Sequence, residues 1–551
     1  MVPAIYFHPE AYTTSGPKLM GRNAAGESFL RGFLRHSKAQ ELWVQVQHRD
    51  HAQHFANTAQ ALGRKEPVRV VDKTTLGGLA GAGMVYFPGP GIGEHALHRA
   101  AYGHGAWSLC GITHTTSSAT AMDALATLVT SPVQPWDAVI CTSSAVKDNV
   151  LRLVQAQVDY LKDRLGITQV VLPQLPVIPL GIHTQDFAFT QAQKIAARAA
   201  ISADEHALVV LFMGRLSFHA KAHPLAMYQA LEAAARASAK TVILIECGWH
   251  ANEPIAKAFT EAANSACPSV KVVTLDGRRE DDRLTAWASA DVFCSLSDNI
   301  QETFGITPIE AMATGLPVVV SDWDGYKDTV RDGVDGFRIP TLMPQAGLGG
   351  DLALRHALEI DTYDMYCGYS CSLVAVDVRA AAAAFTKLFY SAELRRQMGD
   401  AGRQRAQQAY DWATIIPQYE ALWSQLNAAR LDQSPNLASL AFPWPARMDP
   451  LHAFASYPTQ VLTPQTAMVM IDASVNEAMA RVDTYRKLLM VDFAKLVLPT
   501  EAEIRSVLEV AASRQRSAAD LVATIERDRQ AFVLRSLAWL VKLNVLAVSS
   551  S

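Results

Sequence analysis

The amino-acid sequence predicts an α/β protein built from two doubly wound, largely parallel sheets. Three observations predict this class. Short apolar runs of strand length alternate with longer stretches of helical periodicity, the alternation occurs twice along the chain, and half of the 551 residues are apolar. A chain of this length buries several cores, so we expect more than one domain.

The first occurrence of the pattern spans residues 1–195 and is expected to form one domain. Its strand candidates are short apolar runs rich in β-branched residues. They lie at residues 4–7, 42–46, 68–71, 84–87, 138–141 and 169–173. Helical stretches at 26–35 and 146–164 lie between them. Strands joined through helices run parallel, so this half predicts one doubly wound sheet.

The second occurrence spans residues 196–385 and predicts a second domain of the same class, with the hinge near residues 185–203. Its strand candidates lie at residues 207–213, 241–246, 270–274, 292–296, 317–321 and 337–339. Helical segments at 224–237 and 281–290 lie between them. Two such halves in one chain place a ligand cleft between the carboxyl ends of their strands.

The rest of the chain predicts mainly helix. Residues 386–430 are expected to form closing helices, 431–497 a linker or strap with a helix, and 498–551 a small helical module. Thr500 and Glu503 are expected to form a capping box at the start of that module. Three short helices, at 501–511, 518–525 and 529–543, give it a winged-helix-like order. From Glu501 onward seven basic residues face six acidic ones, which favours a protein-interaction or dimerisation module over a DNA-binding one.

The composition narrows the class of partners and the compartment. A net charge of −4 argues against nucleic-acid binding through a broadly basic surface. No secretory signal and no apolar run of membrane-spanning length is expected. Seven cysteines form no regular framework, which favours reduced thiols in the cytoplasm, with peripheral attachment to the inner face of a membrane left open. Cys367 and Cys371 are the one close pair, and without a second pair they predict no zinc site.

The most informative stretch is residues 301–320, which follows the strand predicted at 292–296. Pro308 fits the first turn of a helix that ends before Gly315. Glu302 then lies in the loop before the helix and Glu310 on the helix itself. Two carboxylates placed in this way reach different parts of one long ligand.

The start of the same helix predicts an anion site. Backbone amides at Phe304, Gly305 and Ile306 are expected to point into the cleft, at the positive end of the helix. Such a site suits a diphosphate, and carboxylates are good acceptors for sugar hydroxyls. The residues therefore predict one glutamate for a ribose, one for a transferred sugar, and a diphosphate between them.

The stretch from Glu302 to Pro317 resembles the paired-glutamate motif of family 4 retaining glycosyltransferases, which have the GT-B architecture of two facing Rossmann-like domains. The resemblance covers residues 1–430, most strongly 207–340. It implies that Glu310 binds the nucleotide ribose and that Glu302 contacts the donor sugar as a catalytic residue. It also implies transfer from a nucleoside diphosphate sugar, UDP or GDP, with retention of configuration and without a metal or a separate cofactor.

A second patch follows the strand predicted at 207–213. Gly214 and Arg215 stand at its exit and Lys221 lies six residues beyond the arginine. In the family a pair of cations at this place neutralises the donor diphosphate, with arginine binding phosphate oxygens as a fork and lysine adding a compact charge. Ala222 stands where the family has a glycine, which puts the shape of this loop in question.

The first half is expected to supply the acceptor side. Residues 16–28 form a glycine-rich loop in which Gly26 is predicted to approach the donor and Arg22 to lie near the acceptor. His114 follows an apolar run and matches a histidine at the active-site edge of the family, where it implies a contact with the donor sugar. The acceptor is a hydroxyl of a glycan, a lipid-linked molecule or a small molecule.

Other interpretations stay open. Asp322 and Asp324 form the triplet that holds a metal in the unrelated GT-A architecture, but their position after a strand predicts a loop and no metal. A GT-B phosphorylase or a nucleotide-sugar epimerase would share the same cleft. A regulatory protein that binds DNA or a partner through its C-terminal module is the alternative of another class, and that module is also the expected site of any homo-oligomer contact.

Overall fold

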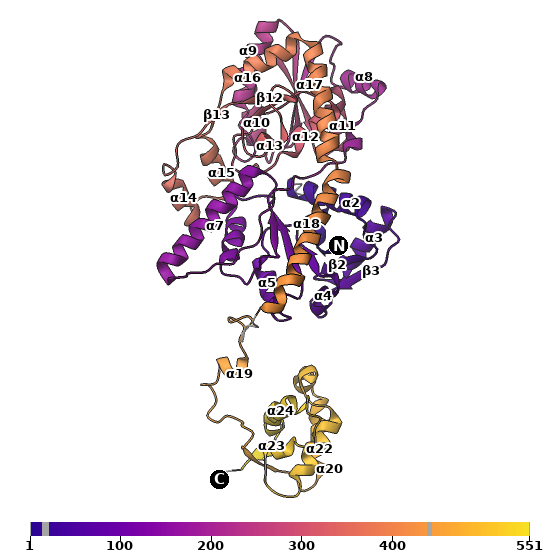
Figure 1. Ribbon diagram of the computed structural model, residues 1–551, viewed down its shortest axis with the longest axis vertical. Helices are drawn as coiled ribbons and strands as arrows, with labels where there is room; N and C mark the ends of the chain where they lie inside the picture. The colour runs from indigo at the N-terminus through magenta and orange to yellow at the C-terminus, as the bar shows by residue number, and fades with distance from the viewer. Residues whose placement is uncertain (1, 14–20, 438–442, 550–551) are drawn as a thin grey trace. The chain divides into compact units, whose positions relative to one another are not determined.

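The computed structural model describes residues 2–13, 21–437 and 443–549, and the chain divides into two compact units, Met1–Trp444 and Pro445–Ser551 (Figure 1). The first unit contains two six-stranded sheets and the second a small sheet with helices. This architecture confirms the predicted α/β class with two parallel sheets and a mainly helical C-terminal region.

The first sheet has the strand order β3-β2-β1-β4-β5-β6, and every neighbouring pair is parallel. Its strands are β1 Ala4–Phe7, β2 Leu42–Val46, β3 Val68–Val71, β4 Met84–Tyr86, β5 Ser108–Ile112 and β6 Ala138–Ile140. Its helices are α1 Pro9–Tyr12, α2 Gly21–His36, α3 Arg49–Ala61, α4 Leu79–Ala82, α5 Gly93–Ala100, α6 Ala119–Ala126 and α7 Ser144–Leu165. Alternate strand residues enter two separate hydrophobic clusters, one on each face, as a doubly wound sheet requires.

The strand predicted at residues 169–173 is wrong. This segment carries prolines at 173, 176 and 179, which cannot donate to a strand ladder. It makes only isolated bridges beside β6, from Gln174 to Ala138 and from Val177 to Cys141. The sixth place in the sheet belongs instead to β5, which the sequence pattern did not single out because Gly111 interrupts its apolar run.

The second sheet has the order β12-β11-β10-β7-β8-β9, again parallel throughout. Its strands are β7 Leu208–Met213, β8 Val242–Gly248, β9 Val270–Asp276, β10 Val292–Ser295, β11 Val318–Ser321 and β12 Gly336–Ile339. Its helices are α8 Gln191–Ala200, α9 Leu225–Ser238, α10 Glu253–Ala266, α11 Glu280–Ser289, α12 Ile306–Thr314 and α13 Tyr326–Thr329. All six strands lie where the apolar runs predicted them, with ends that differ by at most a few residues.

A helical hairpin follows the second sheet, and long helices then lead the chain back to the first half. The hairpin consists of β13 Thr341–Leu342, α14 Gly350–Ala357, α15 Tyr363–Cys371 and β14 Ala375–Val376. The long helices are α16 Val378–Tyr390, α17 Ala392–Arg405 and α18 Trp412–Gln433, with a π-helical turn at Ala406–Tyr410 before α18. Figure 1 shows α18 lying along the first half beside α2.

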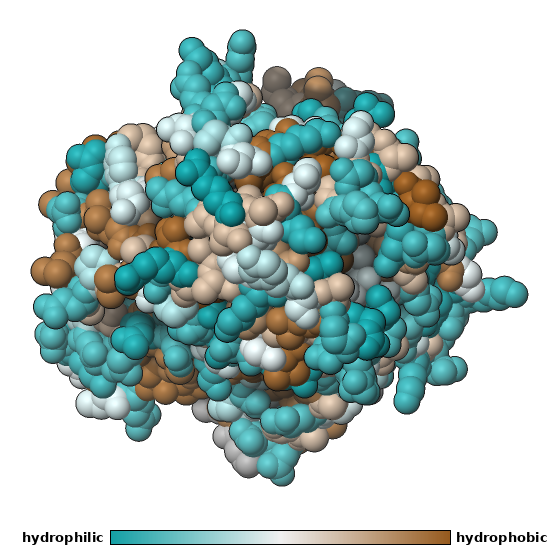
Figure 2. All heavy atoms as spheres, turned by 90° about the horizontal axis from the view of Figure 1, so that it is seen from above, coloured by the Kyte–Doolittle hydropathy of each residue, from teal (hydrophilic) through white to brown (hydrophobic). Residues whose placement is uncertain are grey.

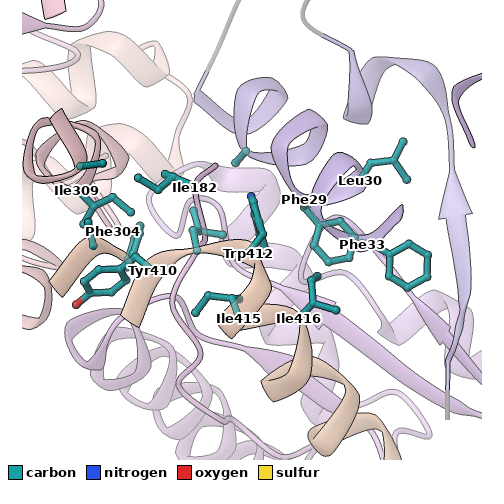
Figure 3. Close-up of a cluster of buried hydrophobic side chains, with 14 of the residues drawn as sticks. Phe29, Leu30, Phe33, Ile182, Phe304, Ile309, Tyr410, Trp412, Ile415 and Ile416 are labelled. Atoms are coloured by element: carbon teal, nitrogen blue, oxygen red, sulfur yellow. The ribbon is translucent and has the colours of Figure 1, made fainter. Parts of the chain in front are cut away.

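The buried aromatic residues of α18 join the core of the first half. Trp412 packs edge-on against Phe29 at a centroid distance of 5.8 Å, and its indole nitrogen donates to Ser28 Oγ at 2.8 Å. A Cβ at Gly32 would lie 2.5 Å from the same indole ring, so α2 approaches it as closely as glycine permits. Figure 3 shows this cluster continuing through Ile182 to the helix that follows β10.

The second unit has its own hydrophobic core beneath an antiparallel three-stranded sheet of order β16-β15-β17. Its elements are α19 Pro450–Ala453, β15 Ala467–Met470, α20 Val475–Arg486, α21 Leu489–Asp492, α22 Glu501–Ala511, β16 Arg516–Ser517, α23 Ala518–Leu521, α24 Gln530–Lys542 and β17 Leu546–Val548. The predicted capping box of Thr500 and Glu503 is confirmed. The small sheet was not predicted, because its strands are only two to four residues long.

The surface drawn in Figure 2 is mixed in hydropathy. On the face drawn in Figure 2, hydrophilic residues alternate with small hydrophobic groups. None of the helices in the described ranges is both long enough and apolar enough to cross a membrane.

Candidate active site

The loop after β7 is shaped by two glycines. Gly214 has φ of +154°, a conformation that side chains disfavour, and its carbonyl oxygen would lie 1.9 Å from a Cβ at Gly248. The loop therefore passes directly over the end of β8 before it turns. This path brings Arg215 and Lys221 toward the loop that follows β10.

Lys221 and Glu302 form an ion pair at the centre of the site. Lys221 Nζ lies 2.6 Å from Glu302 Oε2, and the side chains are 26% and 9% exposed. Tyr326 Oη donates to the same oxygen at 3.3 Å. Burial alone would raise the pKa of Glu302, but the charge of Lys221 and the hydrogen bonds outweigh it and hold the pKa below its usual value. Glu302 is therefore ionised at neutral pH.

Arg215 donates hydrogen bonds to neutral acceptors on two loops, one after β7 and one after β10. Its Nη2 donates to the carbonyl of Ala220 at 2.6 Å and to Gln301 Oε1 at 3.2 Å. Within the residues that the structure describes, Arg215 makes no ion pair with a carboxylate. Its positive charge stays available to an anionic ligand.

The N-terminus of α12 lies directly after the loop that carries Glu302. Gly305 is the N-cap with φ of +86°, and a Cβ there would lie 2.1 Å from Cε1 of Tyr326. No side chain caps the first turn, so the amides that follow Gly305 keep their capacity to bind an anion. The predicted helix from the Pro308 turn to Gly315 is confirmed, and Phe304 before it is buried.

Glu310 lies half-buried on α12, one turn or more beyond the uncapped end. Burial raises its pKa to about 7, and the positive charge of Arg283 opposes that rise. The two glutamates of the motif thus differ in charge state near neutral pH. Glu302 is a charged acceptor, whereas Glu310 is divided between its protonated and ionised forms.

The first half reaches the same loop from the opposite side. Ser143 Oγ, after β6, donates to the carbonyl of Thr303 at 2.8 Å. Thr303 Oγ1 donates to the carbonyl of His114, after β5, at 3.3 Å. His114 is half-buried and lies beside the residue that follows Glu302 in the chain. The loops at the carboxyl ends of both sheets therefore meet at Thr303.

Several residues of the site were not predicted from the sequence, among them Asn299 and Asp324. Asn299 is fully buried and joins three loop segments: its Nδ2 donates to the carbonyl of His219 at 3.0 Å, its Oδ1 accepts from Gln301 N, and its carbonyl accepts from Trp323 Nε1. Asp324 has φ of +43° and accepts from Ser143 Oγ at 3.3 Å. Both follow strand ends, and Asp324 also belongs to the triplet with Asp322 that predicted a loop.

Asp324 shares the electrostatic environment of Glu302. Burial raises the pKa of Asp324 to about 8, and the negative charge of Glu302 adds to the rise. The loop predicted for Asp322 and Asp324 is confirmed, because β11 ends at Ser321 just before them. Among the described residues no group of three His, Cys, Asp or Glu side chains is arranged to hold a metal ion.

The loop predicted at residues 16–28 is wrong from Gly21 onward, because α2 already begins there. Gly26 lies inside α2, where a Cβ would come within 1.9 Å of the carbonyl oxygen of Ala11. Its lack of a side chain is therefore required by the packing of α1 on α2, and its predicted contact with the donor stays a prediction. Residues 14–20 and the side chain of Arg22 lie outside the described part, so the acceptor-side prediction for Arg22 also stays a prediction.

One segment of the chain matches the model of a known protein family. Residues 207–347, which carry β7 to β13 and the Lys221 and Glu302 loops, match the family model described as glycosyl transferases group 1. We call this segment the group 1 domain, after the family model that it matches. The predicted resemblance is thereby confirmed for the second sheet and its loops.

Two relatives match over shorter parts of the chain. A D-inositol 3-phosphate glycosyltransferase of Mycolicibacterium gilvum is 31% identical over 160 residues, which are 29% of this chain and 34% of the relative. A phosphatidyl-myo-inositol mannosyltransferase of Mycobacterium leprae is 48% identical over 59 residues, which are 10% of this chain and 15% of the relative. The chain thus spans about a third or less of the length of these relatives.

A solved structure extends the likeness to both halves. Anabaena Alr3699/HepE, crystallised in complex with UDP, superposes with a TM-score of 0.50 at 15% identity, and the match covers 77% of this chain and all of that protein. At this identity the likeness concerns the fold. It confirms the GT-B arrangement of the group 1 domain with the preceding parallel sheet.

Proposed function

We propose that the protein is a retaining, metal-independent glycosyltransferase that transfers a sugar from a nucleoside diphosphate sugar to an acceptor hydroxyl. The observation that carries the proposal is the Lys221–Glu302 pair beside the unpaired Arg215 and the uncapped end of α12. Two cations and a row of amides suit a diphosphate, and a buried ionised carboxylate suits sugar hydroxyls. The group 1 family match supports the same assignment.

The donor is held by residues of the second half. Arg215, Lys221 and the amides at Gly305 and Ile306 bind the diphosphate, while Glu310 accepts from the ribose hydroxyls. Glu302 accepts from hydroxyls of the transferred sugar once Lys221 turns to the phosphate. Arg215 and the amides are held in place before the donor arrives, so they stabilise charge that develops on the leaving diphosphate at little reorganisation cost.

The reaction exchanges one bond of the sugar carbon for another. The bond between the anomeric carbon and the β-phosphate oxygen breaks, and a bond to the acceptor oxygen forms on the same face. The acceptor proton passes to the departing phosphate oxygen. His114, on the first half, contacts the donor sugar, and no cofactor besides the donor is required.

The substrates are defined by chemistry. UDP is the first donor nucleotide to test, because Anabaena Alr3699/HepE binds UDP, and GDP is the second. The acceptor is a carbohydrate, lipid-linked or small-molecule hydroxyl bound by the first half. We place the protein in the cytoplasm, with protein or self-association through the C-terminal unit.

The donor site is tested by binding of UDP- and GDP-sugars to the full chain, measured by calorimetry and thermal shift. Glu310→Gln and Arg215→Ala are expected to lower donor affinity at least tenfold. The controls Glu261→Gln and Arg279→Ala change exposed residues of the same half and should bind as the parent does. Parental affinity in both site variants would refute the assigned donor site.

The reaction type is tested with the donor that binds best. A retaining transferase is expected to consume the acceptor. The transferred sugar should have the same anomeric configuration in the product as in the donor, as measured by NMR. A product of inverted configuration would refute retention. Conversion of the donor sugar without any acceptor would refute transfer and indicate an epimerase.

A further inference from the structure

An apolar patch on the second unit is exposed to solvent. Six large apolar side chains lie on its surface within ten residues, and Leu489, Phe493 and Leu496 are 82%, 75% and 90% exposed. We call residues 488–497 the 488–497 patch. Its exposed members are Leu488, Leu489, Met490, Phe493, Leu496 and Val497.

The 488–497 patch stands on an ordered base. It contains α21 and the 3₁₀ turn Lys495–Val497, whose backbone hydrogen bonds include Val491 N to the carbonyl of Leu488 at 2.9 Å. Val491 and Tyr485 pack against the core of the unit. The capping box of α22 follows directly, and Glu503 of that box pairs with Arg529 at 2.8 Å. The unit therefore displays these apolar side chains outward on a fixed framework.

The charges at the edge of the patch are mostly positive. Arg486 and the exposed Lys487 precede it, and Lys495 lies within it. Its one acid, Asp492, pairs with Lys495 at 3.1 Å. Between residues 486 and 497, three cations thus face a single carboxylate that already has a partner.

We propose that the 488–497 patch docks the protein on the surface of an anionic lipid bilayer. Apolar side chains on a short helix, with cations at the edge, are the two features that together hold a protein at a membrane interface. The patch is far too short to span a bilayer, so it lies in the headgroup region. A protein partner fits less well, because the cores of protein interfaces are depleted of lysine and enriched in aromatic residues, whereas this patch has one aromatic ring and Lys495, with Lys487 at its edge.

The charges define how binding depends on the lipid and on salt. The apolar side chains enter the boundary between headgroups and acyl chains, while Lys487 and Arg486 face the anionic headgroups. Cations near an anionic surface are attracted to it, and this attraction falls off within a Debye length. Binding should therefore need anionic lipid and weaken as salt is raised.

The proposal is tested with the full chain and vesicles in co-sedimentation. The parent is expected to sediment with vesicles of phosphatidylcholine and phosphatidylglycerol, and at least fivefold less with phosphatidylcholine alone or in 0.5 M NaCl. The double variant Leu489→Ser/Leu496→Ser is expected to lose at least tenfold in partition. The matched control Leu354→Ser/Leu358→Ser changes exposed leucines near α14 in the first unit and should bind as the parent does.

Several outcomes would overturn the assignment. Parental partition of the Leu489→Ser/Leu496→Ser variant would do so, as would loss of binding in the α14 control alone. A parent dimer in sedimentation velocity without vesicles, absent from the double variant, would identify a second copy as the occupant. Because these positions lie on the surface, an unchanged melting curve checks folding, and donor binding by the same variant separates this test from that of the proposed activity.

Discussion

Replacing Lys221 with methionine removes the cation from a carboxylate that is almost fully enclosed. Glu302 is 9% exposed and loses its 2.6 Å partner, while the methionine preserves most of the side-chain volume. Removing one member of a buried pair costs about 3–5 kcal/mol. Lys221 is itself 26% exposed and Tyr326 still donates to the carboxylate, so we expect about 2–3 kcal/mol at pH 8.

The pKa of Glu302 determines how the stability difference between the parent and the variant changes with pH. In the parent the pKa of Glu302 is depressed, so the pair contributes stability above the ordinary carboxylate pKa, and that contribution is lost as the pH falls through the depressed value. Without Lys221, burial dominates and raises the pKa of Glu302. The variant then gains stability on protonation, and its deficit relative to the parent should shrink as the pH falls from 8 to 5.

The assay is urea unfolding of the full chain at pH 5, 6.5 and 8, followed by the fluorescence of the tryptophans. The double variant Lys221→Met/Glu302→Gln should recover at least half of the deficit, because the stranded charge is gone. The exposed pair supplies the control: Lys257→Met, beside Glu261, should change stability by less than about 0.5 kcal/mol. A deficit that is equal at all three pH values, or no recovery in the double variant, would refute the reasoning.

Three further predictions concern other parts of the first unit. Gly305→Ala should cost at least about 3 kcal/mol and abolish donor binding, since a Cβ there meets a tyrosine ring at 2.1 Å, whereas Gly333→Ala, also at positive φ but in open space, should cost about 1 kcal/mol in urea unfolding. Asp324→Asn should flatten the stability profile measured between pH 5 and 8, because a folded pKa of about 8 makes the parent lose stability as the pH rises above the ordinary carboxylate value; an unchanged slope would contradict this. Arg99→Leu strands Asp137, its fully buried partner at 2.6 Å, and should cost about 3–5 kcal/mol in the same unfolding assay, with a loss under 1 kcal/mol as the contrary result.

The sequence predicted those features whose cause is local. The strands of the second sheet are short runs rich in apolar and β-branched residues, so their pattern located all six. The helix after Glu302 was readable because Pro308 and Gly315 act at its two ends. The capping box was predictable because its two residues, Thr500 and Glu503, lie only three positions apart in the sequence.

The features that escaped prediction depend on distant partners. Strand β5 contains Gly111, and the neighbouring loop leaves no room for a side chain at this position. A Cβ there would lie 2.5 Å from the carbonyl oxygen of Gly89. Asp324 acquires its place in the site through Ser143, which comes from the other half of the chain. No local pattern encodes either contact, since both arise only when the sheets have formed.

The return of α18 to the first half makes that half a discontinuous domain. The chain crosses between the halves twice, side by side: Ile182 N donates to the carbonyl of Tyr410 at 2.8 Å, and Trp412 N to the carbonyl of Ile182 at 3.1 Å. During synthesis Phe29 therefore waits for its indole partner until the whole second half has left the ribosome. The order of assembly follows: the group 1 domain can close its sheet first, and the N-terminal half completes its core last.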